Sequence, residues 1–121
     1  MARILIADDA MFMRATMKML LEKNGFEVVG EAENGAIAVK KYMELKPDIV
    51  MLDITMPEMT GIQALQLITK FDPKAKVIMV SAMGQENMIR ESVMFGATSF
   101  IVKPFKEERI IQTLNQILTS E

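Results

Sequence analysis

Cysteine, histidine and tryptophan are absent from this chain of 121 residues. Without cysteine the chain forms no disulfide and no thiolate metal site, which fits a reducing compartment. Without histidine as well, a metal site must be built from oxygen ligands, and oxygen ligands favour hard ions such as Mg²⁺. These absences narrow the possible chemistry before any motif is considered.

Long apolar runs and an excess of basic charge are also missing. No stretch approaches the ~20 apolar residues of a membrane span. The first residues, MARILIADD, hold too short an apolar run for a signal peptide. The net charge is -2, unlike the basic balance of a nucleic-acid-binding domain. We therefore expect a cytoplasmic protein that binds neither a membrane nor a nucleic acid.

What is present is an ordinary globular composition. Hydrophobic residues make up 50% of the chain and charged residues 25%, proportions typical of a folded domain rather than a disordered segment. A chain of this length buries roughly two-thirds of the surface that it exposes when unfolded. We expect residues 1–121 to form one domain.

The order of apolar segments predicts an α/β fold. Short continuous apolar runs predict strands buried on both faces, and stretches with apolar residues three and four apart predict helices. The expected strands are 4–7, 26–32, 49–52, 77–80 and 100–102, and the expected helices are 11–24, 34–45, 60–71, 85–95 and the stretch after 105. Strict alternation implies a doubly wound, five-stranded parallel sheet with helices on both faces. Polar residues interleaved in 26–32 place that strand near a sheet edge.

Cap signals mark the ends of several predicted helices. Gly25 stands where a C-terminal cap belongs, Asn34 can cap the second helix, and Thr60 begins a capping box. The first helix is crowded with methionines, at positions 11, 13, 17 and 19. Filling gaps in the core is the commoner role for such residues, and a methionine-rich surface is the alternative. We expect these methionines to be buried.

Polar side chains directly follow the predicted strands. Two follow the first strand and one follows each of the third, fourth and fifth: Asp8, Asp9, Asp53, Ser81 and Lys103. Sites of open α/β sheets form at the carboxyl ends of the strands. Singly, each residue has a plainer role, as a helix cap, a loop hydroxyl or a solvated charge. Together they indicate a site at one edge of the sheet.

Three carboxylates at one edge require a cation nearby. Each pair repels by ~4 kcal/mol at about 4 Å if the effective dielectric constant is about 20. Mg²⁺ suits an incomplete protein shell, with room for water and phosphate, better than Ca²⁺ does. With Mg²⁺, a hydroxyl and a lysine around it, a carboxylate is well placed to attack a phosphoryl group.

The residues at these strand ends resemble a known family over the whole chain. They match the receiver domain of two-component response regulators in order and spacing, at Asp8-Asp9, Asp53, Ser81-Ala82 and Lys103-Pro104. The stretches "DITMPEMTG", "SAMGQ" and "FIVKPF" are most similar to the single-domain chemotaxis regulators of that family. The resemblance implies a flavodoxin-like fold with strand order 2-1-3-4-5 and five helices.

The resemblance implies a role for each carboxylate. Asp53 would be the phosphoacceptor, which forms an acyl phosphate, and would also ligate Mg²⁺. Asp9 and the backbone carbonyl of Thr55 would be further Mg²⁺ ligands. Asp8 would contact the ion through water.

The resemblance also implies how the phosphoryl group is held. Ser81 and the backbone amide of Ala82 would bind phosphate oxygens, and Lys103 would pair with another. The bond from Lys103 to Pro104 is a candidate cis peptide, although only ~5% of X-Pro bonds in folded proteins are cis.

The expected output is a change of surface. Ser81 would move towards the phosphate and Phe100 would turn inward to fill the vacated space, whereas without the family Phe100 would be taken for a core residue. The fourth helix, the fifth strand and the fifth helix would present the changed surface. We expect Ile89 to be an exposed residue within it.

The expected function is a phosphorylation-controlled switch and not an enzyme, with at most self-phosphorylation from small phosphodonors and autodephosphorylation. The donor would be a sensor histidine kinase, of the chemotaxis type, and the target a flagellar motor switch protein. The chain holds no histidine and no glycine-rich ATP loop, so it is neither the histidine donor nor a kinase. Both a monomer and a weak phosphorylation-dependent dimer fit the sequence.

Several alternatives stay open. A small Mg²⁺-dependent phosphohydrolase would use Asp53 as nucleophile. It would need a general acid, and Thr55 stands where that acid could be, but no cap insertion is present. A phosphorelay intermediate, or a receiver excised from a larger regulator, would look much the same. A module that keeps only the fold is disfavoured because four site residues are intact: Asp9, Asp53, Ser81 and Lys103.

Overall fold

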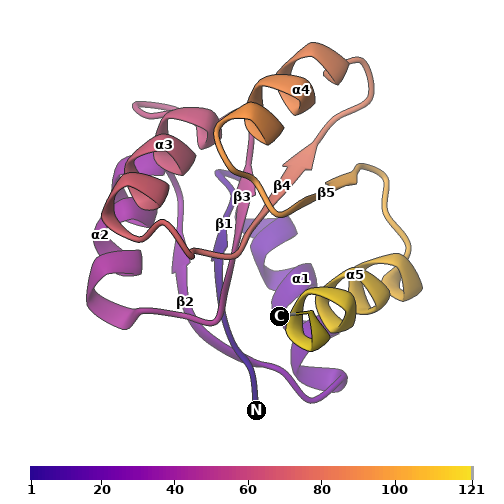
Figure 1. Cartoon of the computed structure of the whole chain (residues 1–121). Coiled ribbons are helices and arrows are strands. Elements are labelled where there is room, and N and C mark those ends of the chain that lie inside the picture. Colours follow the sequence, from indigo (N-terminus) through magenta and orange to yellow (C-terminus); the bar gives the residue numbers. More distant parts are fainter. Residues whose placement is uncertain (121) are drawn as a thin grey trace.

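Strands and helices alternate along the chain in the computed structural model, which describes residues 1–120 (Figure 1). The strands are β1 (Arg3–Ala7), β2 (Glu27–Ala32), β3 (Ile49–Asp53), β4 (Val77–Ser81) and β5 (Ser99–Val102). The helices are α1 (Met11–Lys23), α2 (Gly35–Leu45), α3 (Gly61–Phe71), α4 (Glu86–Met94) and α5 (Glu107–Thr119). The predicted element order is confirmed.

The strands form one parallel sheet in the order β2-β1-β3-β4-β5. The expected doubly wound topology and strand order are therefore confirmed. The chain runs from β1 outward to β2, then returns to the other side of β1 to begin β3. The winding thus reverses between β1 and β3, and the carboxyl ends of these two strands flank the position where open α/β sheets bind ligands.

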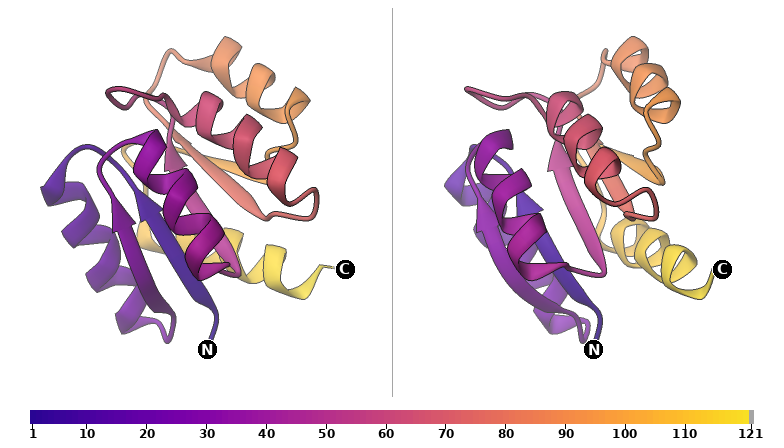
Figure 2. Two further views of the ribbon diagram at one scale, coloured as in Figure 1. Left: turned by 90° about the vertical axis from the view of Figure 1, so that its left-hand side faces the viewer. Right: turned by 60° about the vertical axis from the view of Figure 1, so that its left-hand side comes forward.

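Helices cover both faces of the sheet (Figures 1 and 2). On one face, α2 and α3 pack on a cluster that includes Leu5, Val50 and Leu65. On the other face, α1 and α5 pack on a second cluster that includes Ile4 and Met51. Successive residues of a strand point to opposite faces, so each central strand contributes to both clusters.

The burial of the strands explains why their sequences differ. All residues of β3 and β4 are buried, which explains why both strands are apolar up to their last residue, Asp53 in β3 and Ser81 in β4. β2, at one edge of the sheet, is mostly half-buried, and this confirms the edge position predicted from its mixed sequence. β5, at the other edge, is also partly exposed.

The predicted helix caps are confirmed. The side chain of Asn34 accepts a hydrogen bond from the backbone N–H of Ile37 at 2.8 Å. Thr60 and Gln63 form a reciprocal capping box at the start of α3. Gly25, just beyond α1, has a φ of 87°, a left-handed conformation that glycine adopts without steric cost.

The methionines of α1 are not all in the core, so that expectation is wrong in part. Met17 is buried, but Met11 and Met19 are 75% and 73% exposed. The helix buries only the stripe that faces the sheet, where Met17 and Leu21 lie one turn apart. Met11 and Met19 lie off this stripe.

Among residues 1–120, no helix has the length and apolar composition that a membrane crossing requires.

Candidate functional site

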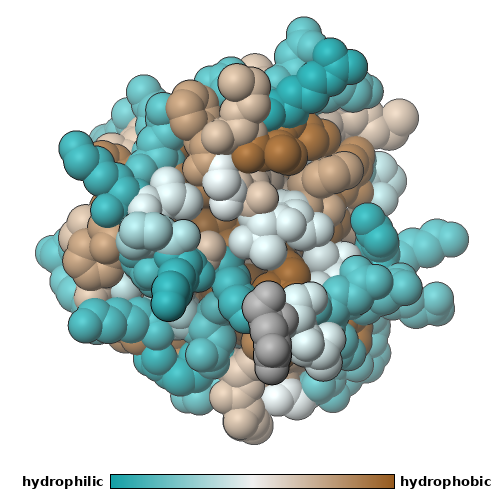
Figure 3. Space-filling view, in the orientation of Figure 1, coloured by the Kyte–Doolittle hydropathy of each residue, from teal (hydrophilic) through white to brown (hydrophobic). Residues whose placement is uncertain are grey.

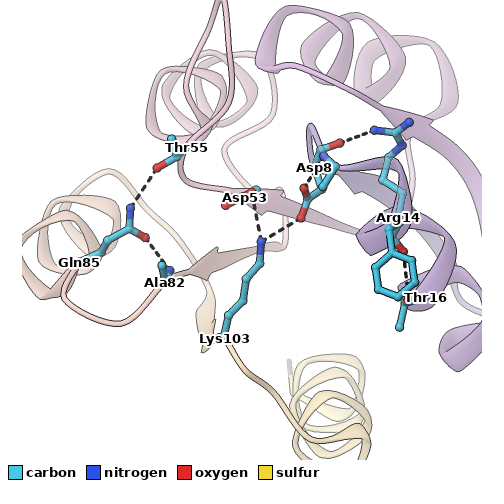
Figure 4. Close-up of polar contacts among 10 residues, drawn as sticks. Asp8, Arg14, Thr16, Asp53, Thr55, Ala82, Gln85 and Lys103 are labelled. Atoms are coloured by element: carbon cyan, nitrogen blue, oxygen red, sulfur yellow. Dashed lines mark hydrogen bonds and ion pairs between the residues drawn. The ribbon is translucent and has the colours of Figure 1, made fainter.

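Three strand ends bring charged side chains together at the carboxyl edge of the sheet (Figure 4). Asp53 is the last residue of β3, and Asp8 follows β1 directly. Lys103 follows β5 and reaches back towards both carboxylates. The site therefore forms where the winding of the sheet reverses, as the strand-end argument predicted.

Asp8, Asp9 and Asp53 form an acidic cluster. One carboxylate oxygen from each residue lies within 4.8 Å of the others. Asp8 and Asp53 are buried and Asp9 is exposed, so the cluster opens to solvent on the side of Asp9. A set of carboxylate oxygens with one open side suits Mg²⁺, which keeps several water ligands. The donor set therefore fits the expected ion.

Lys103 bridges two members of this cluster. Its Nζ atom lies 3.1 Å from Oδ2 of Asp8 and 3.3 Å from Oδ2 of Asp53. The peptide bond between Lys103 and Pro104 is cis. Burial lowers the pKa of Lys103, but the carboxylates of Asp53 and Asp8 outweigh burial, and the net pKa lies above its ordinary value. The ammonium is thus kept charged beside the carboxylates.

The pKa of Asp53 is raised above its ordinary value. Burial is the largest cause and the neighbouring charge of Asp8 adds to it, while Lys103 and the backbone N–H of Thr55 lower the pKa without cancelling the rise. The protein thus holds Asp53 in a place that disfavours its negative charge. A divalent cation at the cluster would reverse this balance, which further supports the fit to Mg²⁺.

Several backbone and side-chain contacts orient Asp8. Its Oδ1 accepts a hydrogen bond from the N–H of Ala10 at 2.9 Å, and its carbonyl accepts one from Nη1 of Arg14 at 2.6 Å. Arg14 also pairs with Glu31 on β2 at 3.3 Å. The N-cap of α1 is Ala10, without a side-chain cap, so the plainer role of Asp8 or Asp9 as helix cap is not observed. Sequence reasoning missed Arg14, because charge spacing alone does not show which backbone carbonyl an arginine reaches.

Ser81, at the end of β4, has a buried hydroxyl without a partner. Its residue exposure is 0%, and among residues 1–120 its Oγ atom has no hydrogen-bond partner. Buried polar groups are normally hydrogen-bonded, so this hydroxyl requires a partner that residues 1–120 do not supply.

Comparison with known proteins identifies the family. Residues 4–115 match the family described as the response regulator receiver domain. The chain belongs to this family. The receiver is 56% identical over 115 residues to the chemotaxis protein CheY of Thermotoga maritima, covering 95% of this chain and 96% of that protein. It is 57% identical over 116 residues to CheY of Bacillus subtilis, covering 96% and 97%.

Solved receiver structures share the fold. CheY in the CheX-CheY-BeF3-Mg²⁺ complex from Borrelia burgdorferi has a TM-score of 0.93 and 37% identity, covering 98% of this chain and 90% of that one. The response regulator domain of Thermotoga maritima CheB has a TM-score of 0.90 and 36% identity, covering 99% and 98%. The chain is thus a receiver closely similar to CheY, and the phosphohydrolase alternative is not favoured. Receiver domains are phosphoacceptor switches rather than classical enzymes. Receiver domains bind Mg²⁺ at an acidic pocket, which in this chain is the Asp8, Asp9 and Asp53 cluster.

Two further residues of this receiver contact each other beside the strand ends. The side chain of Gln85 donates a hydrogen bond to the hydroxyl of Thr55 and accepts one from the backbone N–H of Ala82 (Figure 4). The sequence did not predict a role for Gln85, because its partners, Ala82 and Thr55, lie on two different loops. The expected role of the Thr55 carbonyl towards the metal stays a prediction.

A glycine fixes the chain just beyond Asp53. The N–H of Gly61 donates to the carbonyl of Ile54 at 2.8 Å. A Cβ atom added to Gly61 would lie 2.1 Å from the carbonyl oxygen of Asp53, far inside van der Waals contact. The start of α3 can therefore approach the end of β3 only because this position lacks a side chain.

Two of the receiver's expected output residues, Ile89 and Phe100, line one pocket of about 500 Å³ between α4 and β5. Phe100 is 38% exposed and lines this pocket, so it is not a plain core residue. Ile89 also lines the pocket but is half-buried and packs against the core under α2 and α3; the expectation that it is exposed is wrong. Hydrophobic side chains gather on the surface around α4 (Figure 3), where Val93 and Met94 are exposed.

Proposed function

We propose that this receiver is a chemotaxis response regulator that accepts a phosphoryl group on Asp53. The cluster geometry supports the assignment. Asp53 is the last residue of β3, lies in one cluster with Asp8 and Asp9, and pairs with Lys103. We propose that residues 1–121 act as one receiver domain in the cytoplasm, by likeness to CheY.

Mg²⁺ would be held by Asp9, Asp53 and the backbone carbonyl of Thr55, with Asp8 contacting it through water. When bound, the ion neutralises charge on the phosphoryl oxygens and on the carboxylates. An Asp53 oxygen attacks phosphorus, the new O–P bond forms, and the bond from phosphorus to the donor's histidine nitrogen breaks, leaving the electron pair on that nitrogen.

The remaining strand ends would hold the transferred group. Lys103 has its ammonium 3.3 Å from an Asp53 oxygen, close to where phosphoryl charge would develop. The orphaned hydroxyl of Ser81 and the backbone N–H of Ala82 would each bind a phosphoryl oxygen. The single observation that carries the proposal is the pairing of Lys103 with the buried carboxylate of Asp53 inside the acidic cluster.

The signal would leave by protein contact. A sensor histidine kinase of the chemotaxis type would be the donor and a flagellar motor switch protein the target, by likeness to the chemotaxis proteins above. Movement of Ser81 and Phe100 would alter the surface of α4, β5 and α5, where the pocket with Ile89 lies. The protein would act as a monomer or a weak phosphorylation-dependent dimer.

The test is phosphodonor titration with Mg²⁺. Acetyl phosphate should label the wild-type protein and leave Asp53→Asn unlabelled, while Asp48→Asn, at the opposite end of β3, should label normally. Binding of a flagellar motor switch peptide should tighten on phosphorylation. No labelling of the wild type would overturn the phosphoacceptor proposal; labelling without tighter peptide binding would overturn only the motor target.

A further inference from the structure

Gln85 joins two loops at the rim of the site (Figure 4). Its Oε1 accepts the backbone N–H of Ala82 at 2.7 Å, and its Nε2 donates to Oγ1 of Thr55 at 3.0 Å. Because a backbone N–H can only donate, the Ala82 contact fixes which side-chain atom is the oxygen. Gln85 occupies the N-cap position of α4 without capping that helix through its side chain, so its hydrogen bonds serve the loops instead.

The Ala82 N–H is therefore already occupied. This further step rests on the proposed function, in which the same N–H binds a phosphoryl oxygen of modified Asp53. One N–H donates one strong hydrogen bond, so the Gln85 carbonyl and the phosphoryl oxygen exclude each other there. We propose that Gln85 is a positioning residue that competes with the phosphoryl group for the Ala82 amide and so opposes phosphorylation.

Displacement of Gln85 has a second effect. When the Gln85 side chain leaves Ala82, its hydrogen bond to Thr55 also breaks, because the same side-chain amide makes both bonds. Gln85 also lines the pocket that contains Ile89 and Phe100. Phosphorylation would thus change this pocket at the start of α4, in addition to any movement of Ser81.

Amide exchange tests the occupied state without any phosphodonor. In the Mg²⁺-loaded, unphosphorylated protein, NMR hydrogen exchange at the Ala82 amide should be at least about threefold faster in Gln85→Ala than in wild type. Gln112→Ala, an exposed glutamine on α5, is the matched control and should not change it. Equal exchange at Ala82 in wild type and Gln85→Ala would overturn the proposal.

Beryllofluoride affinity tests the competition. At saturating Mg²⁺, Gln85→Ala should bind beryllofluoride roughly three- to tenfold more tightly than wild type, the scale of one lost hydrogen bond. Gln85→Glu keeps an acceptor for Ala82 and adds a negative charge, so its affinity should fall below wild type. The control Gln112→Ala should bind beryllofluoride with the affinity of the wild type.

The outcomes separate the two proposals. If wild type binds beryllofluoride in a manner that depends on Asp53, but Gln85→Ala binds no more tightly, the role of Gln85 is wrong and the phosphoacceptor assignment stands. If wild type does not bind at all, both fail. A thermal unfolding midpoint for each variant shows that it is folded, and Gln85→Glu supplies the test if the alanine variant is not.

Discussion

The Nζ atom of Lys103 lies 3.3 Å from Oδ2 of Asp53. The same carboxylate belongs to the acidic cluster that fits Mg²⁺, so the ammonium and the metal ion would both interact with the negative charge of Asp53. Lys103 thereby has two opposed effects: it stabilises the buried carboxylates, and it weakens their attraction for a second cation.

Lys103→Met should therefore tighten Mg²⁺ binding and reduce phosphorylation. Loss of a competing ammonium should lower the dissociation constant for Mg²⁺ about fivefold, after allowance for partial exposure of the pair. Uptake of phosphoryl from acetyl phosphate should fall about 100-fold, because the charge beside the phosphoryl oxygens is lost. Calorimetric Mg²⁺ titration and labelling measure the two effects. Lys106→Met, at an exposed neighbouring position, is the control, and weaker Mg²⁺ binding in Lys103→Met would contradict the argument.

Asp53→Asn should stabilise the metal-free protein. The raised pKa of Asp53 shows that its environment favours the neutral form, and asparagine is neutral with nearly the same shape. We expect the free energy of unfolding in EDTA to rise by about 0.5–2 kcal/mol. Adding Mg²⁺ should stabilise the wild type more than this variant. Urea unfolding with and without Mg²⁺ measures both, and a less stable variant in EDTA would show that pairing with Lys103 outweighs burial.

The raised pKa of Asp53 also predicts a pH dependence. The folded pKa lies above the unfolded one, so the contribution of Asp53 to stability in EDTA is greatest at low pH and is lost as pH rises through the folded pKa. Metal binding has the opposite slope, because Mg²⁺ requires the ionised carboxylate. Mg²⁺ affinity should therefore start to fall at a pH above the ordinary aspartate range of about 4. A Mg²⁺ titration series from pH 4 to 8 checks this, with a flat profile down to about pH 4 as the contrary result.

Gly61→Ala should destabilise the protein and disturb Asp53. The new Cβ would lie 2.1 Å from the Asp53 carbonyl oxygen, and backbone must move to admit it. We expect a loss of about 2–3 kcal/mol in the free energy of unfolding, with weaker Mg²⁺ binding. Gly30→Ala is the matched control, because its closest contact, at 2.8 Å, is the mobile end of the Leu45 side chain. Equal losses in the two variants would refute the argument.

The sequence predicts the fold well because the central strands are apolar except for one residue at an end. The apolar run at residues 49–52 is buried along its whole length, so its sequence admits few other interpretations. Asn34 and Thr60 were found because a cap acts on backbone only three residues away. The strand order, by contrast, came from family resemblance, since alternation alone leaves several windings possible.

The parts that sequence reasoning missed depend on contacts between distant or irregular segments. Arg14 reaches the Asp8 carbonyl and Gln85 reaches Thr55, which is 30 positions away. Neither contact produces a repeating pattern in the sequence from which it could be predicted. The prediction that Ile89 is exposed was wrong for a related reason. The sequence does not show which of the apolar residues of α4 faces the core, and in the structure Ile89 is the one that packs against it.

The sheet separates the hydrophobic interior into two clusters that share no residue. Neighbouring positions of β1 alternate between them, with Ile4 and Ile6 on the side of α1 and α5, and Leu5 and Ala7 on the side of α2 and α3. Substitutions on opposite sides should therefore add almost independently. For protein engineering, the α1 and α5 layer can be exchanged with that of a relative while the packing beneath α2 and α3 is retained.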